Sequence, residues 1–190
     1  GFETEGTEKN VHKDTAEMLG GMGSIFVEKT LDFLPGPLSR LSIGFDHVPH
    51  EIRTGSISRQ DVELTDHNAE RENNVPRTNK AAATLKNINT AYLTLSMTDF
   101  LYVKAGLQEM DVTTREKLET GSDYGNTSID GYIVGIGAHI ENDNGFFARL
   151  EVNQTELDGV KLISTTNADN SVTLDDISGM SARVSIGKSF

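Results

Sequence analysis

Two stretches of strict alternation, separated by a turn, constrain the fold of this chain more than any other feature. Between Gly131 and Asn153 almost every second residue is apolar, and most positions between hold glycine or polar side chains. The apolar series are Tyr132, Val134, Ile136, Ala138 and Ile140, and then Phe146, Ala148, Leu150 and Val152. Alternation with a period of two over this length predicts β-strands rather than a helix. The Asn144-Gly145 pair between the two series predicts a tight hairpin turn.

The residues on the second face of this hairpin indicate which kind of antiparallel sheet it belongs to. This face combines small residues, Gly135 and Gly137, with the opposite charges of Arg149 and Glu151. Small residues suit the concave side of a tight barrel, and opposite charges can pair there. An apolar outer face and a polar inner face are what a transmembrane β-barrel requires. The alternative is a soluble antiparallel sheet with one face in water.

The same alternation recurs along the chain and predicts an all-β, antiparallel up-and-down transmembrane β-barrel of about eight strands. Residues 22–190 form a single barrel domain in this interpretation, and residues 1–21 form a polar arm or outer loop. The pattern blurs at Asn87, Ile88 and Asn89, where we expect a bulge or the outer rim. The seven expected strands cover 22–31, 38–48, 82–97, 101–111, 129–140, 146–162 and 179–190.

The connections between these strands alternate in length. Short ones fall at 32–37, 98–100 and 141–145, and long ones at 49–80, 112–128 and 164–178. Short turns at one end and long loops at the other are typical of a bacterial outer-membrane barrel, whose short turns face the periplasm. A soluble up-and-down barrel has no need of this asymmetry.

Phenylalanines gather at the short-turn end. An aromatic girdle there indicates a membrane–water interface. Lys29 and Lys188 interrupt the apolar faces near the same end, where their ammonium groups can reach the headgroups. Phe147 lies at the same end but on the face of Arg149 and Glu151, so the expected interface aromatics are Phe33, Phe100, Phe146 and Phe190.

The alternation also assigns side chains to the inside or the outside of the barrel. Charges inside a narrow lumen must be paired, because burying an unpaired charge is costly. The expected lumen charges are Glu28, Arg40, Asp46, Lys104, Arg149, Glu151 and Arg183. The expected lipid-facing residues are Val103, Leu107, Ile136, Leu150, Val184 and Ile186.

Composition excludes several function classes. A formal net charge of −12 argues against nucleic-acid binding, and the absence of cysteine excludes thiolate metal sites. No segment approaches the roughly 20 apolar residues of a membrane helix. The mean hydropathy of −0.37 does not separate soluble proteins from membrane barrels, whose lumen and loops are polar. The sequence starts at Gly1 without a signal peptide, so we expect one to have been removed or to lie outside the printed sequence.

The last strand adds a resemblance to a known family. Ala182, Val184 and Ile186 lead in alternating positions to the terminal Phe190, which is similar to the C-terminal signature of bacterial outer-membrane barrels; Lys188 departs from it. With the Tyr132–Val152 hairpin, residues 22–190 resemble the small OmpA/OmpX and opacity-type barrels. The resemblance implies an outer-membrane location, contact with lipid and lipopolysaccharide, and recognition of the Phe190 end by the barrel-assembly machinery.

No motif predicts catalytic, metal-binding or cofactor-binding residues. His47 to Glu51 has metal-ligand residue types, but Pro49 breaks the geometry. The segment from Asp123 to Asp130 lacks the spacing of a calcium loop. Serine and histidine occur without the sequence context of a hydrolase. The sequence therefore predicts no enzyme, with an outer-membrane hydrolase or acyltransferase as the remaining enzymatic alternative.

Three functional classes remain open. The first is a structural or surface-interaction barrel, closed to solutes, with acidic outer loops. The second is a narrow porin-like channel for small polar solutes. The third is a soluble β-barrel that binds an apolar ligand or builds a particle or filament. The first is favoured because side chains just fill an eight-stranded barrel.

Strand number gives a last expectation. Bacterial single-chain barrels have an even number of strands, whereas seven are expected here. The missing strand should lie between 22–31 and 179–190. We expect it to come from upstream of Gly1, from a separate peptide or another copy of the chain, or from irregular pairing by residues 1–10.

Overall fold

The computed structural model describes residues 2–8, 13–18, 21–53, 57–61, 77–117, 123–166 and 171–189. These residues form strands and one short 3₁₀ helix, η1 (Gly36–Arg40). The strands are β1 (Phe2–Glu8), β2 (Lys13–Met18), β3 (Ile25–Thr30), β4 (Leu41–Val48), β5 (Ile52–Arg53), β6 (Ile57–Asp61), β7 (Arg77–Ser96), β8 (Leu101–Lys117), β9 (Thr127–Glu141), β10 (Phe146–Leu157), β11 (Val160–Ile163), β12 (Ser171–Leu174) and β13 (Ile177–Lys188).

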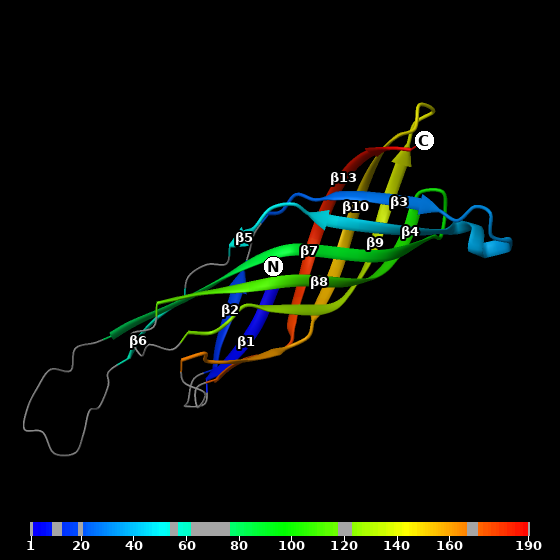
Figure 1. Cartoon of the computed structure of the whole chain (residues 1–190). Helices are drawn as coiled ribbons and strands as arrows, with labels where there is room; N and C mark the ends of the chain where they lie inside the picture. The colour runs from blue at the N-terminus through cyan, green and yellow to red at the C-terminus, as the bar shows by residue number, and fades with distance from the viewer. Residues whose placement is uncertain are drawn as a thin grey trace, which may run out of the picture.

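A single antiparallel sheet organises the chain. Its centre is a meander in the order β3-β4-β7-β8-β9-β10-β13, and each strand pairs with its neighbours in that order. The sheet curls strongly, so that β3 and β4 lie across β10 and β13 (Figure 1). The all-β antiparallel fold is confirmed, and each of the seven expected ranges overlaps one strand of the meander. The described strands form a half-barrel, since β3 and β13 do not pair with one another.

Three short turns lie at one end of the sheet, as the sequence predicts. At the turn between β7 and β8, the Thr98 hydroxyl oxygen accepts hydrogen bonds from the backbone N–H groups of Phe100 and Leu101. At the turn between β9 and β10, the Asn142 side chain accepts two backbone N–H groups, and Gly145 has φ +79°. This confirms the expected Asn-Gly turn, because a positive φ favours glycine.

The opposite end contains more strand than the sequence pattern predicts. β5, β6 and the start of β7 lie within the predicted loop 49–80, β8 runs on to Lys117, and β12 lies within 164–178. The expected strand 146–162 is divided into β10 and β11. The Asp158-Gly159 pair separates them, and the Gly159 N–H donates to the Asp176 carboxylate at 2.9 Å.

The N-terminal region also differs from a featureless loop. β1 pairs along its length with β2, and its residues Phe2 and Glu3 pair with Gly179 and Ser178 at the start of β13. The hairpin therefore extends the sheet beyond β13. Irregular pairing by residues 1–10 was one of the expected solutions to the missing strand.

The predicted bulge is confirmed. The register between β7 and β8 shifts between Lys86 and Asn89, and Asn87 has φ +50°. Asparagine tolerates this left-handed conformation better than most residues. The Asn87 side chain donates to the Asp111 carboxylate at 2.7 Å, which fixes the bulge against β8.

A glycine on β9 gives a test of this packing. A Cβ atom at Gly131 would collide with the backbone of Glu156 and Leu157 on β10, and backbone cannot move aside as a flexible side chain can. We expect Gly131→Ala to lower the free energy of unfolding by about 1–3 kcal/mol through overpacking. Gly125→Ala is the matched control, because a Cβ there meets open space. Urea unfolding of both variants measures the difference, and equal stability would contradict the close packing.

Candidate functional site

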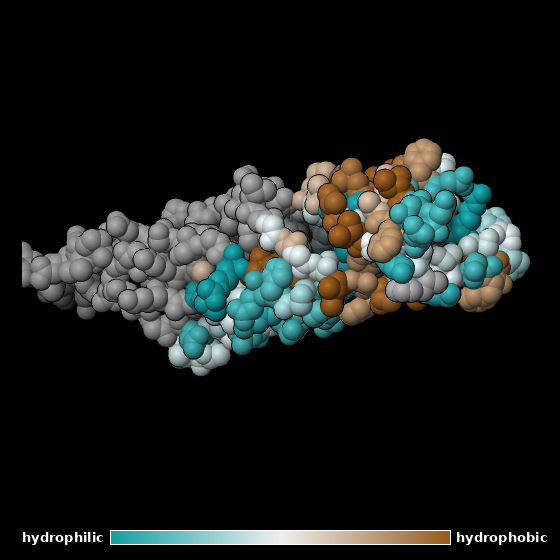
Figure 2. All heavy atoms as spheres, turned by 90° about the horizontal axis from the view of Figure 1, so that it is seen from above, coloured by the Kyte–Doolittle hydropathy of each residue, from teal (hydrophilic) through white to brown (hydrophobic). Residues whose placement is uncertain are grey.

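The convex face of the sheet carries a belt of exposed apolar side chains at the short-turn half. Figure 2 shows this half as a brown patch between hydrophilic regions. Each meander strand contributes, so the patch is continuous rather than scattered. The belt consists of Ile25, Val27, Ile43, Phe45, Leu93, Val103, Leu107, Tyr132, Val134, Ile136, Ile140, Phe146, Leu150, Val152, Met180, Val184 and Ile186. Soluble monomers rarely expose continuous apolar surface on this scale.

Directly behind the belt, the concave face holds ion pairs that join strands far apart in sequence. The guanidinium of Arg149 on β10 donates two hydrogen bonds of 2.8 Å to the Glu28 carboxylate on β3. Arg183 on β13 pairs with Asp46 on β4. The bidentate geometry of the first pair is the strong form of an arginine–carboxylate contact. Both pairs connect one side of the curled sheet to the other.

A second ion pair is almost completely buried. Lys104 Nζ donates to Glu151 Oε2 at 3.3 Å, and these side chains are only 2% and 5% exposed. The Tyr102 hydroxyl donates to the other oxygen of Glu151 at 2.7 Å. Lys104 Nζ also lies 4.2 Å from the centre of the Tyr92 ring. Glu151 therefore has partners for both oxygens, which is what allows a charge to be buried.

Aromatic rings pack beside these charges on the concave face. The Phe26 and Phe147 rings lie 6.1 Å apart, and the Arg149 guanidinium lies 4.9 Å from the Phe147 ring. Phe147 points into the concave face, over Gly187, as the alternation of the hairpin predicts. Strand alternation is the reason, because Phe147 shares the face of Arg149 while Phe146 has the opposite one.

Polarity reverses on both faces at the level of the β7 bulge. Along the concave face of β8, Lys104 is followed by Met110 and Val112; along its convex face, Leu107 is followed by Glu109. Beyond the bulge the concave face is therefore apolar and the convex face polar, as in a soluble sheet. The buried apolar cluster on this side consists of Val48, Ile88, Met110, Val112, Ile129 and Leu157.

Most of the residues that the sequence assigned to a face lie on that face. The concave face holds Glu28, Asp46, Lys104, Arg149, Glu151 and Arg183. The convex face exposes Val103, Leu107, Ile136, Leu150, Val184 and Ile186, and Phe33, Phe100 and Phe146 are exposed at the short-turn end. Phe190 lies outside the described residues.

Arg40 is the exception among the expected lumen charges. It is exposed, lies in η1 rather than in a strand, and donates to the Met97 carbonyl at 3.4 Å. Pro37 at the start of η1 explains the error, since the Gly36-Pro37 sequence begins a helical turn and delays β4 to Leu41. The strand alternation was extended too far toward the N-terminus.

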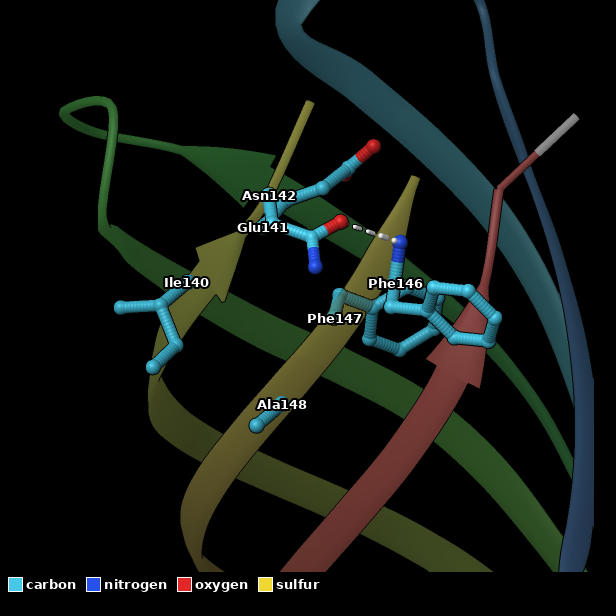
Figure 3. A pocket seen from close by; sticks show the side chains of 6 residues that line it. All are labelled: Ile140, Glu141, Asn142, Phe146, Phe147 and Ala148. Carbon is cyan, nitrogen blue, oxygen red and sulfur yellow. Dashed lines mark hydrogen bonds between the residues drawn. The ribbon is translucent and has the colours of Figure 1, made fainter. Parts of the chain in front are cut away.

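A hollow opens on the surface at the end of the β9–β10 hairpin. Figure 3 shows Ile140 and Ala148 on its wall beside Asn142, whose side chain accepts the Phe146 N–H. Glu141, Phe146 and Phe147 complete the lining. The hollow is shallow, and its lining lacks the paired polar groups of a small-molecule site.

The described residues contain no arrangement that indicates catalysis or metal binding. They include no cluster of three or more metal-ligand side chains. His47 Nδ1 is hydrogen bonded to Asn89 at 2.8 Å, and His50 Nε2 accepts the Gly23 N–H. Outside the belt, the hydrogen bond from Lys86 lowers the pKa of Glu51 below its ordinary value.

Two further findings concern membrane helices and relatives. In the part of the chain that the structure describes, no helix is long and apolar enough to cross a membrane. Comparison with protein-family models, curated proteins and solved structures found no match to this chain. The fold and the chemistry of its two faces are therefore the basis for any functional conclusion.

Sequence reasoning missed the polarity reversal and the hydroxyl groups that support the charges. Gln108, Met110 and Val112 follow Lys104 on one face, so the change from charged to apolar was visible in the sequence. The contacts of Tyr92 and Tyr102 were not visible, because they depend on how far the sheet curls.

Proposed function

We propose that this chain is a membrane-spanning β-barrel of the bacterial outer membrane, closed to solutes, with a structural or surface-interaction role. The observation that carries the proposal is the reversal of polarity on both faces at one level. A soluble sheet has no reason to exchange its apolar and polar faces halfway along each strand. A strand that passes from lipid into water needs this exchange. In the membrane the convex face contacts lipid and is apolar, whereas in water the convex face is polar and the apolar side chains turn to the buried concave face.

The position of the belt supports the same boundary. Leu107 lies on the lipid side of the β7 bulge and Glu109 on the water side, so one step along β8 marks the outer surface of the membrane. At the other boundary, Phe33, Phe100 and Phe146 are exposed beside the short turns. Transmembrane barrels carry girdles of aromatic residues at both interfaces, and the position of these three phenylalanines fits such a girdle.

The interior supports a closed barrel over the porin-like channel. The Lys104–Glu151 pair and the Glu28–Arg149 pair fill the concave face behind the belt. The apolar cluster around Met110 and Val112 covers the same face beyond it. A solute would have to separate these ion pairs and then pass this apolar cluster, which opposes the passage of small polar molecules.

Folding into lipid tests the proposal. We expect urea-unfolded protein diluted into phosphatidylcholine vesicles to float with them and to migrate differently on gels before and after boiling. In a planar bilayer of the same lipid we expect no conductance steps. Protein that stays folded in the supernatant without detergent would support the soluble alternative, and reproducible conductance steps would support the channel.

The long-loop end is the surface available for interaction. Exposed acidic side chains there include Glu109, Asp130, Glu156 and Asp176, in keeping with the net charge of −12. A negative surface attracts cations and basic partners and repels nucleic acid. We therefore assign surface interaction to this end and anchoring to the belt.

A further inference from the structure

The described sheet has two unpaired edges that face the same gap. We call this gap the seam: it is bounded by β3 from Ile25 to Thr30 and by β13 from Ser181 to Gly187. Within the described residues, no strand pairs with these edges. The two most exposed side chains of the belt lie on the β13 edge, at 78% for Val184 and 81% for Ile186, against 55% for Leu150 on β10 inside the sheet.

Strand direction determines what can close the seam. The seven meander strands alternate in direction, so β3 and β13, the first and the last, run the same way. Direct pairing of the two would be parallel, whereas a strand between them can be antiparallel to both. The Glu28–Arg149 and Asp46–Arg183 pairs already hold the two sides together across the concave face. The seam therefore has the topology to accept one more strand.

The pairing of β1 with β13 shows in which register, and from which end of the seam, an added strand would pair with β13. Phe2 lies opposite Gly179 and Glu3 opposite Ser178, so β1 runs antiparallel to β13 and points its N-terminal end into the seam. Continuing this register places the preceding positions opposite β13 as far as Gly187. On its other edge β1 pairs with β2, which leads along the chain to β3. The β1–β2 hairpin is therefore linked to both borders of the seam: β1 pairs with β13, and β2 precedes β3 in the chain.

We propose that the seam is a strand-acceptor site and that its occupant is an extended segment of the same polypeptide on the N-terminal side of Phe2. Its side chains follow from the register. Positions opposite Val184 and Ile186 face outward with the belt and are apolar. Positions opposite Arg183 and Ser185 face the concave side, which Phe26 and the ion pairs crowd, and are small or polar. The added strand satisfies both rows of backbone groups, which lipid would leave without partners.

Disulfide formation tests the register, because the chain contains no cysteine of its own. The probe is an extension of alternating valine and serine before Phe2. In one variant, a cysteine replaces the extension residue six positions before Phe2, opposite Ser185, and is combined with Ser185→Cys. In a second variant, the cysteine lies five positions before Phe2 and is combined with Val184→Cys, so that both kinds of antiparallel pair are sampled. The control shifts the extension cysteine by one position, which turns it to the other face.

We expect at least one in-register pair to form an intramolecular disulfide in protein folded in detergent, at least tenfold more than the shifted control. A covalent dimer through Ser185→Cys or Val184→Cys would assign the seam to a second copy and overturn the proposal. Equal linkage of in-register and shifted cysteines, or none in folded protein, would also overturn it. Disulfide formation is measured in detergent and needs no membrane insertion. A negative result would therefore contradict the strand-acceptor proposal without deciding whether the protein spans a membrane.

Discussion

Replacing Lys104 by methionine should destabilise the folded protein by about 3–5 kcal/mol, the usual consequence of breaking a buried ion pair. The lysine side chain is 2% exposed, and Glu151 would keep its charge with only the Tyr102 hydroxyl and a weak contact from Asn153 as partners. Methionine has nearly the same length, so loss of volume contributes little. The midpoint of urea unfolding in lipid vesicles, at an unchanged slope, measures the effect.

Two controls isolate the buried charge as the cause. Lys86→Met breaks the ion pair with Glu51, but these side chains are 36% and 42% exposed, so we expect a loss within about 1 kcal/mol. Adding Glu151→Gln to Lys104→Met removes the unpaired charge and should restore most of the lost stability. A loss below about 1 kcal/mol for Lys104→Met alone would mean that water reaches Glu151, which would also reopen the channel interpretation.

The sequence predicted the features that depend on neighbours in the chain. The Gly131–Asn153 hairpin was readable because its alternation is unbroken and its turn contains Asn144-Gly145. The concave position of Arg149 and Glu151 follows from the same period of two. The bulge at Asn87 was visible as an interruption of that period.

The pairing of charges depends on the curl of the sheet, which the sequence does not state. Glu28 and Arg149 are 121 residues apart, and no spacing rule connects them. Arg40 was misplaced because Pro37 starts a helical turn before the strand. The local sequence pattern thus predicted on which face of the sheet a side chain lies, whereas its ion-pair partner depends on the tertiary structure.

Replacing Leu150 by arginine should destabilise the protein by about 2–4 kcal/mol in lipid vesicles, if the belt lies in the hydrocarbon region. Leu150 is 55% exposed on the convex face, and its strand neighbours there are Ala138 and Val184, so the arginine would have no charged partner directly opposite it. Glu109→Arg is the matched control, since Glu109 is exposed on the convex face of β8 beyond the polarity reversal. We expect that variant to stay within about 0.5 kcal/mol of the parent, as surface substitutions usually do. A soluble barrel would tolerate arginine at both positions equally, because water would surround both. The difference between the two variants therefore compares the surroundings of the belt with those of the convex face beyond the polarity reversal, and its absence would place the belt outside the membrane.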